Sequence, residues 1–365
     1  ARTFGMDGLF EIAGIYSSEG QKYTPVDVDS LMSYREATDG QILQEGICES
    51  GAIASFLAAG TAYAVHGVPT IPFYIFYSMF GFQRVGDMIW SCADMMCRGF
   101  LLGGTAGRTT LNGEGLQHED GHSHVLATTV PNLKSYDPAF SYELAVIIRD
   151  GIYRMYEQQE NIFYYLTLYN ENYVMPRMPD NAACAEGIIK GAYCWRRSDC
   201  DDEPVHLLAS GSIMQQAIAA SIKLEELGYA VHIWSVTSYT ELCREAEACE
   251  RHNRLHPLEI VQEPYLVTLF ANESGPVVAV SDYMKALPNS IARWMPKNFT
   301  SLGTDGFGLS ESRPDLRDHF EICHRHITHA ALVALYRDGK IDRAALEQQM
   351  KDLVIVGDKL DPMSR

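Results

Sequence analysis

The stretch that decides the fold runs from Glu49 to Phe76 and reads ESGAIASFLAAGTAYAVHGVPTIPFYIF. Alanines and branched apolar residues recur on more than one face over residues 49–66, and no Pro interrupts them, which predicts a buried helix. Residues 70–76, TIPFYIF, form the short apolar run typical of a buried strand. This stretch therefore predicts a helix that leads directly into a strand.

The same alternation continues along the chain. We predict further helices over residues 78–97, 141–158 and 213–228, and a terminal pair of helices that begins at residue 326. We predict further strands over residues 98–104, 161–170, 205–212, 230–236 and 275–283. Between about 175 and 204 the pattern breaks. Strands that alternate with helices indicate parallel sheets covered on both faces. The fold class is thus α/β, with two consecutive α/β domains of mainly parallel sheets at 39–190 and 191–365, after a lead segment at 1–38.

Composition excludes several classes of partner and location. The chain has 365 residues, 29 Lys plus Arg against 47 Asp plus Glu, and a formal net charge of −18, so phosphate backbones and anionic membrane surfaces should repel it. It has no uninterrupted apolar run of spanning length. Its nine cysteines contain no CxxC pair, which favours reduced thiols. We expect a cytoplasmic protein that binds neither nucleic acid nor membranes.

Three features are candidates for chemistry. Glu49 opens the Ala-rich helix, where a carboxylate also complements the helix dipole without any further role. Tyr77 and Phe80 stand three residues apart at a strand-to-helix turn, which lets two rings face one space, although core packing is the simpler explanation of aromatic residues. The edge of an α/β sheet is nevertheless where ligands bind.

The third feature is the loop LNGEGLQHEDGHSH, residues 111–124, with Glu114, His118 and two further histidines. Imidazole titrates near neutral pH, so the loop indicates proton transfer or metal binding. A metal set of His118, Asp120, His122 and His124 has suitable ligand types. The spacing of His118 and His122 requires a helix, however, and Gly121 between them disfavours one, so we rank proton transfer first and expect no metal ligands here.

Several long strings together resemble one family. They include GQILQEGICESGA, IPFYIFYSMFGFQRVGD, GGTAGRTTLNGEGLQHEDGHSH and LGTDGFGLSESRPDLRDHFE. In this order they resemble the homodimer-type first component of bacterial pyruvate dehydrogenase complexes, which is thiamine-diphosphate dependent and transketolase-like. The resemblance implies that the chain contains the family's pyrimidine-binding domain followed by its transketolase-like C-terminal domain.

The resemblance also assigns roles to individual residues. Glu49 would hydrogen-bond the ring nitrogen of the cofactor's aminopyrimidine, within a buried setting beside Cys48, Ala52 and Ala54. Tyr77 and Phe80 would stack on that ring, and Arg84 would support the pocket. In the histidine loop, His118 would exchange protons at the substrate carbonyl and Glu114 would line the same pocket. His122 and His124 would order the loop.

The family's diphosphate and magnesium site belongs to an N-terminal half that this sequence does not contain. GTDGFG (303–308) has no GxGxxG spacing and is followed by no Asn, and Leu309 stands where the family pattern suggests a basic residue. The implied function is decarboxylation of pyruvate, a small 2-oxo acid, with transfer of the two-carbon unit to a lipoyl group. The chain would be active only with a diphosphate-binding half or subunit, in a homo- or hetero-oligomer.

Three other functions stay open at this stage. The first is a subunit of a split enzyme that passes a two-carbon ketol or acetyl unit to a carrier protein. The second is a non-catalytic subunit that stabilises a partner. The third is a metal-dependent hydrolase built on the histidine loop.

Overall fold

The computed structural model describes residues 8–26, 35–180, 182–200, 202–296 and 298–364, so part of the predicted lead segment lies outside the described residues. Within that segment a short helix, α1 (Gly8–Ala13), precedes two strands of two residues each, β1 (Ile15–Tyr16) and β2 (Glu36–Ala37), which pair in parallel. The domain boundaries at 38 and 190 remain predictions.

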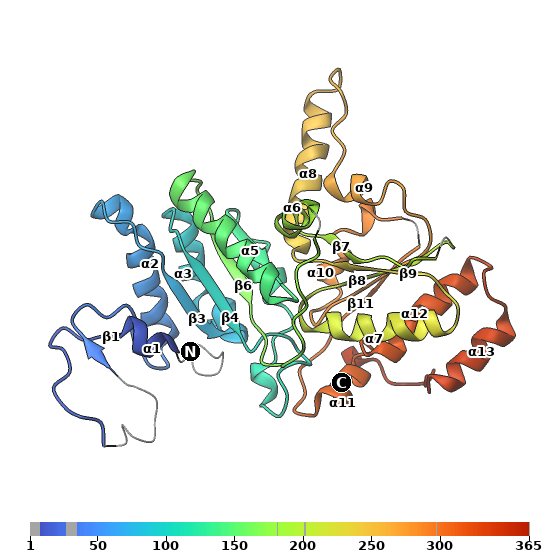
Figure 1. Ribbon diagram of the computed structural model, residues 1–365, viewed down its shortest axis with the longest axis horizontal. Coiled ribbons are helices and arrows are strands. Elements are labelled where there is room, and N and C mark those ends of the chain that lie inside the picture. Colours follow the sequence, from blue (N-terminus) through green and yellow to red (C-terminus); the bar gives the residue numbers. More distant parts are fainter. Residues whose placement is uncertain (1–7, 27–34, 181, 201, 297, 365) are drawn as a thin grey trace.

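The first large sheet has four parallel strands in the order β3-β4-β6-β5. They are β3 (Phe73–Tyr77), β4 (Phe100–Gly104), β5 (Leu133–Tyr136) and β6 (Phe163–Thr167). Figure 1 shows the helices α2 (Glu49–Val65) and α3 (Ser78–Asp94) on one side of this sheet and α5 (Ser141–Ile152) on the other. A single π-helical turn at Tyr153–Glu157 extends α5, and the short α4 (Ser123–Ala127) follows the histidine loop.

The second sheet has five strands in the order β11-β10-β8-β9-β7. These are β7 (Tyr193–Arg196), β8 (Val205–Ala209), β9 (Val231–Ser235), β10 (Val277–Val280) and β11 (Phe299–Leu302). Only the edge strand β7 is antiparallel to its neighbour, β9. The prediction of mainly parallel sheets is therefore confirmed, and the exception is an edge strand.

Helices cover both faces of the second sheet. In Figure 1 α7 (Met214–Glu226) and α12 (His324–Arg337) lie below it, while α8 (Tyr239–Leu255) and α9 (Tyr265–Leu269) lie above it. The remaining helices are α6 (Ala182–Lys190), α10 (Ala286–Asn289), α11 (Arg313–His319) and α13 (Arg343–Asp352). The predicted terminal helix pair corresponds to α12 and α13.

Three predictions about local structure were wrong. The region 175–204 is not irregular throughout, because α6 and β7 lie within it, and β5 was not predicted at all. Loop 111–124 contains a 3₁₀ turn, Leu116–His118. The helix α2 is also less buried than its Ala-rich sequence suggests, since its buried residues are Ile53, Phe56, Gly60 and Thr61, while Ala54 and Ala58 are exposed.

The carboxyl ends of the two sheets meet at a polar seam. Asp282, which follows β10, accepts hydrogen bonds from the backbone N–H groups of Thr109 and Thr110 at 2.9 and 3.0 Å, and both threonine hydroxyls donate to it as well. Ser210, after β8, donates to Asp137, after β5, at 2.7 Å. Loops from both sheets are thus tied together beside the histidine loop.

Among the residues that the structure describes, no helix is both long and apolar enough to cross a membrane.

Candidate active site

The predicted site begins where α2 begins. Glu49 is the first residue of α2, as predicted, and its side chain is 18% exposed. Its predicted burial is wrong for this chain, because Cys48 and Ala54 are exposed and Ala52 is only half-buried. Arg84, on α3, donates a hydrogen bond from Nη1 to the Glu49 Oε1 atom at 2.8 Å. This charge-assisted bond holds the Glu49 carboxylate in a fixed orientation.

The aromatic pair lies next to this ion pair. Tyr77 ends β3 and Phe80 lies in the first turn of α3, with ring centroids 6.3 Å apart and ring planes at 87°. The Arg84 guanidinium carbon lies 4.0 Å from the centroid of the Phe80 ring, a cation–π contact. Gly81 lets α3 pack closely against β3, since a Cβ atom at that position would lie 2.1 Å from the Phe76 ring.

The histidine loop completes the cluster. β4 pairs with β3 so that Gly104 is opposite Tyr77, and the loop that follows β4 therefore leaves the sheet beside Tyr77. The His118 ring centroid is 5.8 Å from that of Tyr77 and 5.2 Å from that of Phe80. Its Nδ1 atom lies 3.7 Å from a Glu114 carboxylate oxygen and accepts or donates no hydrogen bond among the described residues.

All six predicted site residues therefore lie in one chain of contacts, from Glu49 through Arg84, Phe80 and Tyr77 to His118 and Glu114. The surface that they form is open, since Tyr77 is 44% exposed and the Arg84 side chain 50% exposed. It combines a carboxylate, two rings and an imidazole, which can bind a flat heterocycle and move a proton near it.

The two other histidines of the loop, His122 and His124, are held by contacts within the protein. His124 is buried and hydrogen-bonds Ser135 at 2.6 Å and Thr167 at 3.1 Å, and burial lowers its pKa. His122 contacts Gln83 and a guanidinium nitrogen of Arg108. These rings do not converge with His118, so in the described part of the chain the metal set considered above is not assembled.

Sequence reasoning missed two buried charged residues beneath the loop. Arg108 is 6% exposed and donates to the carbonyl oxygens of Thr304, at 2.6 Å, and Gly306. Glu119, which follows His118, is 0% exposed, and no hydrogen bond to either carboxylate oxygen is formed by the described residues. Burial raises its pKa to about 7, although the backbone of Leu309 and the charge of Arg108 oppose the rise. The sequence does not reveal their burial, because the carbonyl oxygens that Arg108 binds lie 196 and 198 positions further along the chain.

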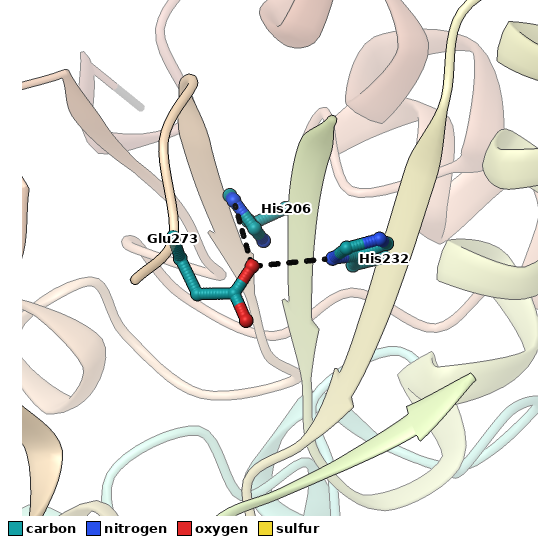
Figure 2. Close-up of side chains that lie close together, drawn as sticks. All are labelled: His206, His232 and Glu273. Atoms are coloured by element: carbon teal, nitrogen blue, oxygen red, sulfur yellow. Dashed lines mark ion pairs between the residues drawn. The ribbon is translucent and has the colours of Figure 1, made fainter. Parts of the chain in front are cut away.

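A second polar cluster lies at the opposite edge of the second sheet. Figure 2 shows the carboxylate of Glu273 between His206 and His232, at the amino ends of β8 and β9, with oxygen-to-nitrogen distances of 3.9 and 3.4 Å. Arg197 joins it, donating to Glu273 at 2.6 Å. We call these four residues the His206 cluster.

The hydrogen bonds of the His206 cluster argue against metal ligation. Trp234 Nε1 donates to Nδ1 of His206 at 3.1 Å, so the neutral ring carries its proton on Nε2, which lies 2.7 Å from the Ser274 carbonyl oxygen. Both ring nitrogens are thus engaged, and the Arg197 guanidinium already neutralises the carboxylate. The cluster therefore holds the segment before β10 against the sheet.

Comparison with known families gives two adjoining matches. Residues 1–176 match the family model of the pyruvate dehydrogenase E1 component middle domain, and residues 191–323 match that of the transketolase-like C-terminal domain. The chain is 51% identical to the pyruvate dehydrogenase E1 component of Pseudomonas aeruginosa, covering 100% of this chain and 41% of that protein. Against the Escherichia coli K12 protein the identity is also 51%, over 99% of this chain and 41% of that one. The chain thus spans about two fifths of the length of these curated relatives.

Solved structures agree on the fold. A transketolase from Leishmania mexicana superposes with a TM-score of 0.62 at 18% identity, covering 84% of this chain and 40% of that one. A split gene transketolase, solved as an inactive beta4 tetramer, has a TM-score of 0.58 at 14% identity, and the match covers 92% of this chain and 97% of that one. At these identities the likeness establishes a transketolase-like fold.

Proposed function

Since the chain belongs to the pyruvate dehydrogenase E1 component family and carries its middle and C-terminal domains, we propose that it supplies the pyrimidine-facing half of a thiamine-diphosphate site that decarboxylates pyruvate. The observation that carries this proposal is the continuous contact from Glu49 through Arg84, Phe80 and Tyr77 to His118. It brings together the residue types that such a site requires.

The residues present fit the aminopyrimidine part of the cofactor. Two solvent-facing aromatic rings beside a partly buried carboxylate suit a flat, weakly basic heterocycle. Tyr77 and Phe80 would hold the ring by stacking. Glu49, with Oε1 bonded to Arg84, would hydrogen-bond a ring nitrogen through its other oxygen. When bound, thiamine diphosphate would supply the electron sink for the loss of carbon dioxide from a 2-oxo acid.

The chain's own contribution is orientation and proton transfer. Arg84 keeps the Glu49 carboxylate in place, so that its second oxygen can form a hydrogen bond with a ring nitrogen. His118 has an unsatisfied Nδ1 atom at the same surface and would hold or release a proton at the substrate carbonyl oxygen. Glu114, whose carboxylate lies 3.7 Å from that nitrogen, would help to orient the imidazole.

The open surface supports a requirement for a partner. Because Tyr77 and Arg84 are about half exposed, another chain or segment is needed to enclose the reacting groups. We propose that this is the diphosphate-binding half, which would also hold magnesium, in a homo- or hetero-oligomer acting in the cytoplasm. A lipoyl domain is the proposed acceptor of the two-carbon unit. A second candidate is a split enzyme with another carrier protein, since a split gene transketolase has this fold.

The test uses the complex isolated from the protein's own source. Native mass spectrometry should find the diphosphate-binding region, on the same or a second polypeptide, together with thiamine diphosphate, and the complex should release carbon dioxide from pyruvate. Glu49→Ala should abolish turnover with little loss of folding. Glu45→Ala, four residues earlier at an exposed position, is the matched control and should retain turnover.

His118→Ala separates substrate chemistry from cofactor binding. It should lower pyruvate turnover by about 100-fold or more, the usual contribution of a positioned acid–base group, while cofactor affinity stays within a small factor. His66→Ala, at the exposed far end of α2, is its control. Unchanged turnover in Glu49→Ala, or a complete loss of cofactor binding in His118→Ala, would contradict the assigned roles.

A further inference from the structure

A separate cavity lies in the second half of the molecule. Its volume is about 520 Å³, and its walls come from α7, α11, the start of α12 and the loops that follow β4 and β6. In Figure 1 the short helix α11 lies at the lower edge of the molecule, near the C-terminus. None of the six predicted site residues lines this cavity. It is therefore distinct from the surface described above.

The lining is positively charged although the chain as a whole is strongly acidic. Three of the lining residues, Arg313, Arg317 and Arg325, are arginines, and one, Glu171, carries a carboxylate. Glu171 pairs with Arg317, and Arg325 pairs with Asp318, which is not a lining residue. The chain's formal charge is −18, so a local excess of guanidinium groups at a cavity is unusual for it. The 14-residue helix α12 also begins at this wall, with His324, and its N-terminal end carries a partial positive charge.

Hydrogen bonds within the protein use only part of these donors. Arg317 is 5% exposed, bonds Glu171 through both terminal nitrogens and also donates from Nη2 to the Thr110 hydroxyl, while its Nε atom is buried away from the cavity. Arg313 donates from Nε to the Thr110 carbonyl oxygen at 2.7 Å and from Nη2 to that of Asn170 at 3.3 Å. Arg325 is engaged with Asp318 and with the carbonyl oxygen of Leu353.

Neutral polar groups line the rest of the wall. Asn112, Gln216 and Ser312 contribute amide and hydroxyl groups, and Gln216 Oε1 accepts from the backbone N–H of His324 at 3.1 Å. A volume of 520 Å³ lies in the range of small-molecule sites and exceeds what inorganic phosphate fills. Arginines recognise phosphate oxygens, and amides and hydroxyls recognise the hydroxyl groups of an ester.

We propose that this cavity binds a small, hydroxylated phosphate ester, with the phosphate at Arg313 and Arg317 and the hydroxyl groups at the amide side chains. This assignment does not depend on the proposed function, because it uses no residue of that site. The Nη1 donor left over at Arg313, the charge of Arg317 and the partial charge of α12 would attract the dianion, and Glu171 limits how much negative charge the cavity accepts.

The test is isothermal titration of the purified chain at constant ionic strength. The probes are glucose 6-phosphate, glycerol 3-phosphate, inorganic phosphate and citrate. We expect one site per chain, with the two esters binding more tightly than inorganic phosphate. Tighter binding of citrate than of both esters would overturn the assignment to a phosphate ester, and so would the absence of saturable binding by either ester.

Two variants that each add one negative charge test whether the ester binds in this cavity. Gln216→Glu keeps an acceptor for the His324 N–H and adds a negative charge at the cavity wall, so ester affinity should fall by about tenfold or more, equivalent to ~1.4 kcal/mol. Gln215→Glu places the same charge on the neighbouring residue of α7, which does not line the cavity, and affinity should change by less than about threefold.

Equal weakening in the two variants would overturn the site, since it would show a general charge effect. Both variants place the added acid in the first turn of α7, where negative charge is favourable for the helix. Arg313→Gln is a further variant, and it should also weaken ester binding. Circular dichroism of each variant verifies that it is folded. Unaltered ester affinity in both Gln216→Glu and Arg313→Gln would likewise overturn the site.

Discussion

Replacing Glu119 by Gln removes a buried charge whose effect on stability depends on pH. The Glu119 side chain is 0% exposed and receives no hydrogen bond from the described residues, and burial raises its pKa from 4.5 to about 7. Between these two pH values the folded chain therefore binds more protons than the unfolded chain. The stabilisation by this group is fully present below pH 4.5 and is lost as the pH rises through about 7.

The magnitude follows from the difference in pKa. One unit corresponds to about 1.4 kcal/mol, so the interval from 4.5 to about 7 gives at most ~3 kcal/mol. We expect about 2 kcal/mol, because solvent close to the loop screens part of the field. Gln does not titrate. The difference in free energy of unfolding between the parent chain and Glu119→Gln should therefore shift by about 2 kcal/mol in favour of the variant from pH 4.5 to pH 8.

Urea unfolding followed by circular dichroism, repeated at several pH values from 4.5 to 8, measures this shift. The amide of Gln lowers the free energy of unfolding by an amount that is the same at every pH, because its own N–H groups are unpaired. This constant cancels when differences at two pH values are compared. Glu114→Gln is the matched control, since it makes the same substitution on the same loop at a side chain that is 48% exposed, and Glu119→Gln should show the larger shift. A difference for Glu119→Gln that stays flat, within about 0.5 kcal/mol, would refute the reasoning.

Two more predictions concern the second sheet. Asp282→Ala should lower the free energy of unfolding by about 2–4 kcal/mol, measured by urea unfolding, because the buried donors of Thr109 and Thr110 lose their acceptor. A loss below about 1 kcal/mol would show that the seam tolerates unpaired donors. For His206, burial lowers the pKa below 6.5, so the unfolded chain binds more protons in acid and stability should fall as the pH drops below about 6.5. His206→Asn should make the melting temperature less sensitive to pH between 7 and 5, and an unchanged pH dependence would contradict this.

Periodicity predicted the helices and strands whose pattern is local. The helix starting at Glu49, the strand ending at Tyr77 and the units from residue 205 to residue 236 could be placed because apolar spacing and turn residues mark them. β5, α6, β7 and β11 were missed. Each is short, and β5, β7 and β11 are edge strands whose pairing depends on residues distant in the sequence.

The candidate site likewise contains residues that the sequence could identify and residues that it could not. Glu49, Tyr77, Phe80 and His118 were named as candidates because they stand in motif-like strings to which the resemblance gives roles, and the structure brings them together. Arg108 and Glu119 stand in one of the same strings, but their burial and their partners follow from the tertiary structure and could not be read from it. The burial expected for Glu49 was overestimated because small apolar residues were read as the core of this chain, whereas Ala54 and Ala58 face outward.

The seam at Asp282 has a consequence for dissecting the molecule. The first family match ends at residue 176 and the second begins at residue 191, which suggests expressing the first region alone. Such a piece would retain Thr109 and Thr110 but lose a carboxylate about 170 positions later that accepts from both their N–H and hydroxyl groups. Contacts of such high sequence separation form late and must form together. A boundary between homologous modules is here not a boundary between cooperative folding units, and limited proteolysis in the linker should release no stable fragment.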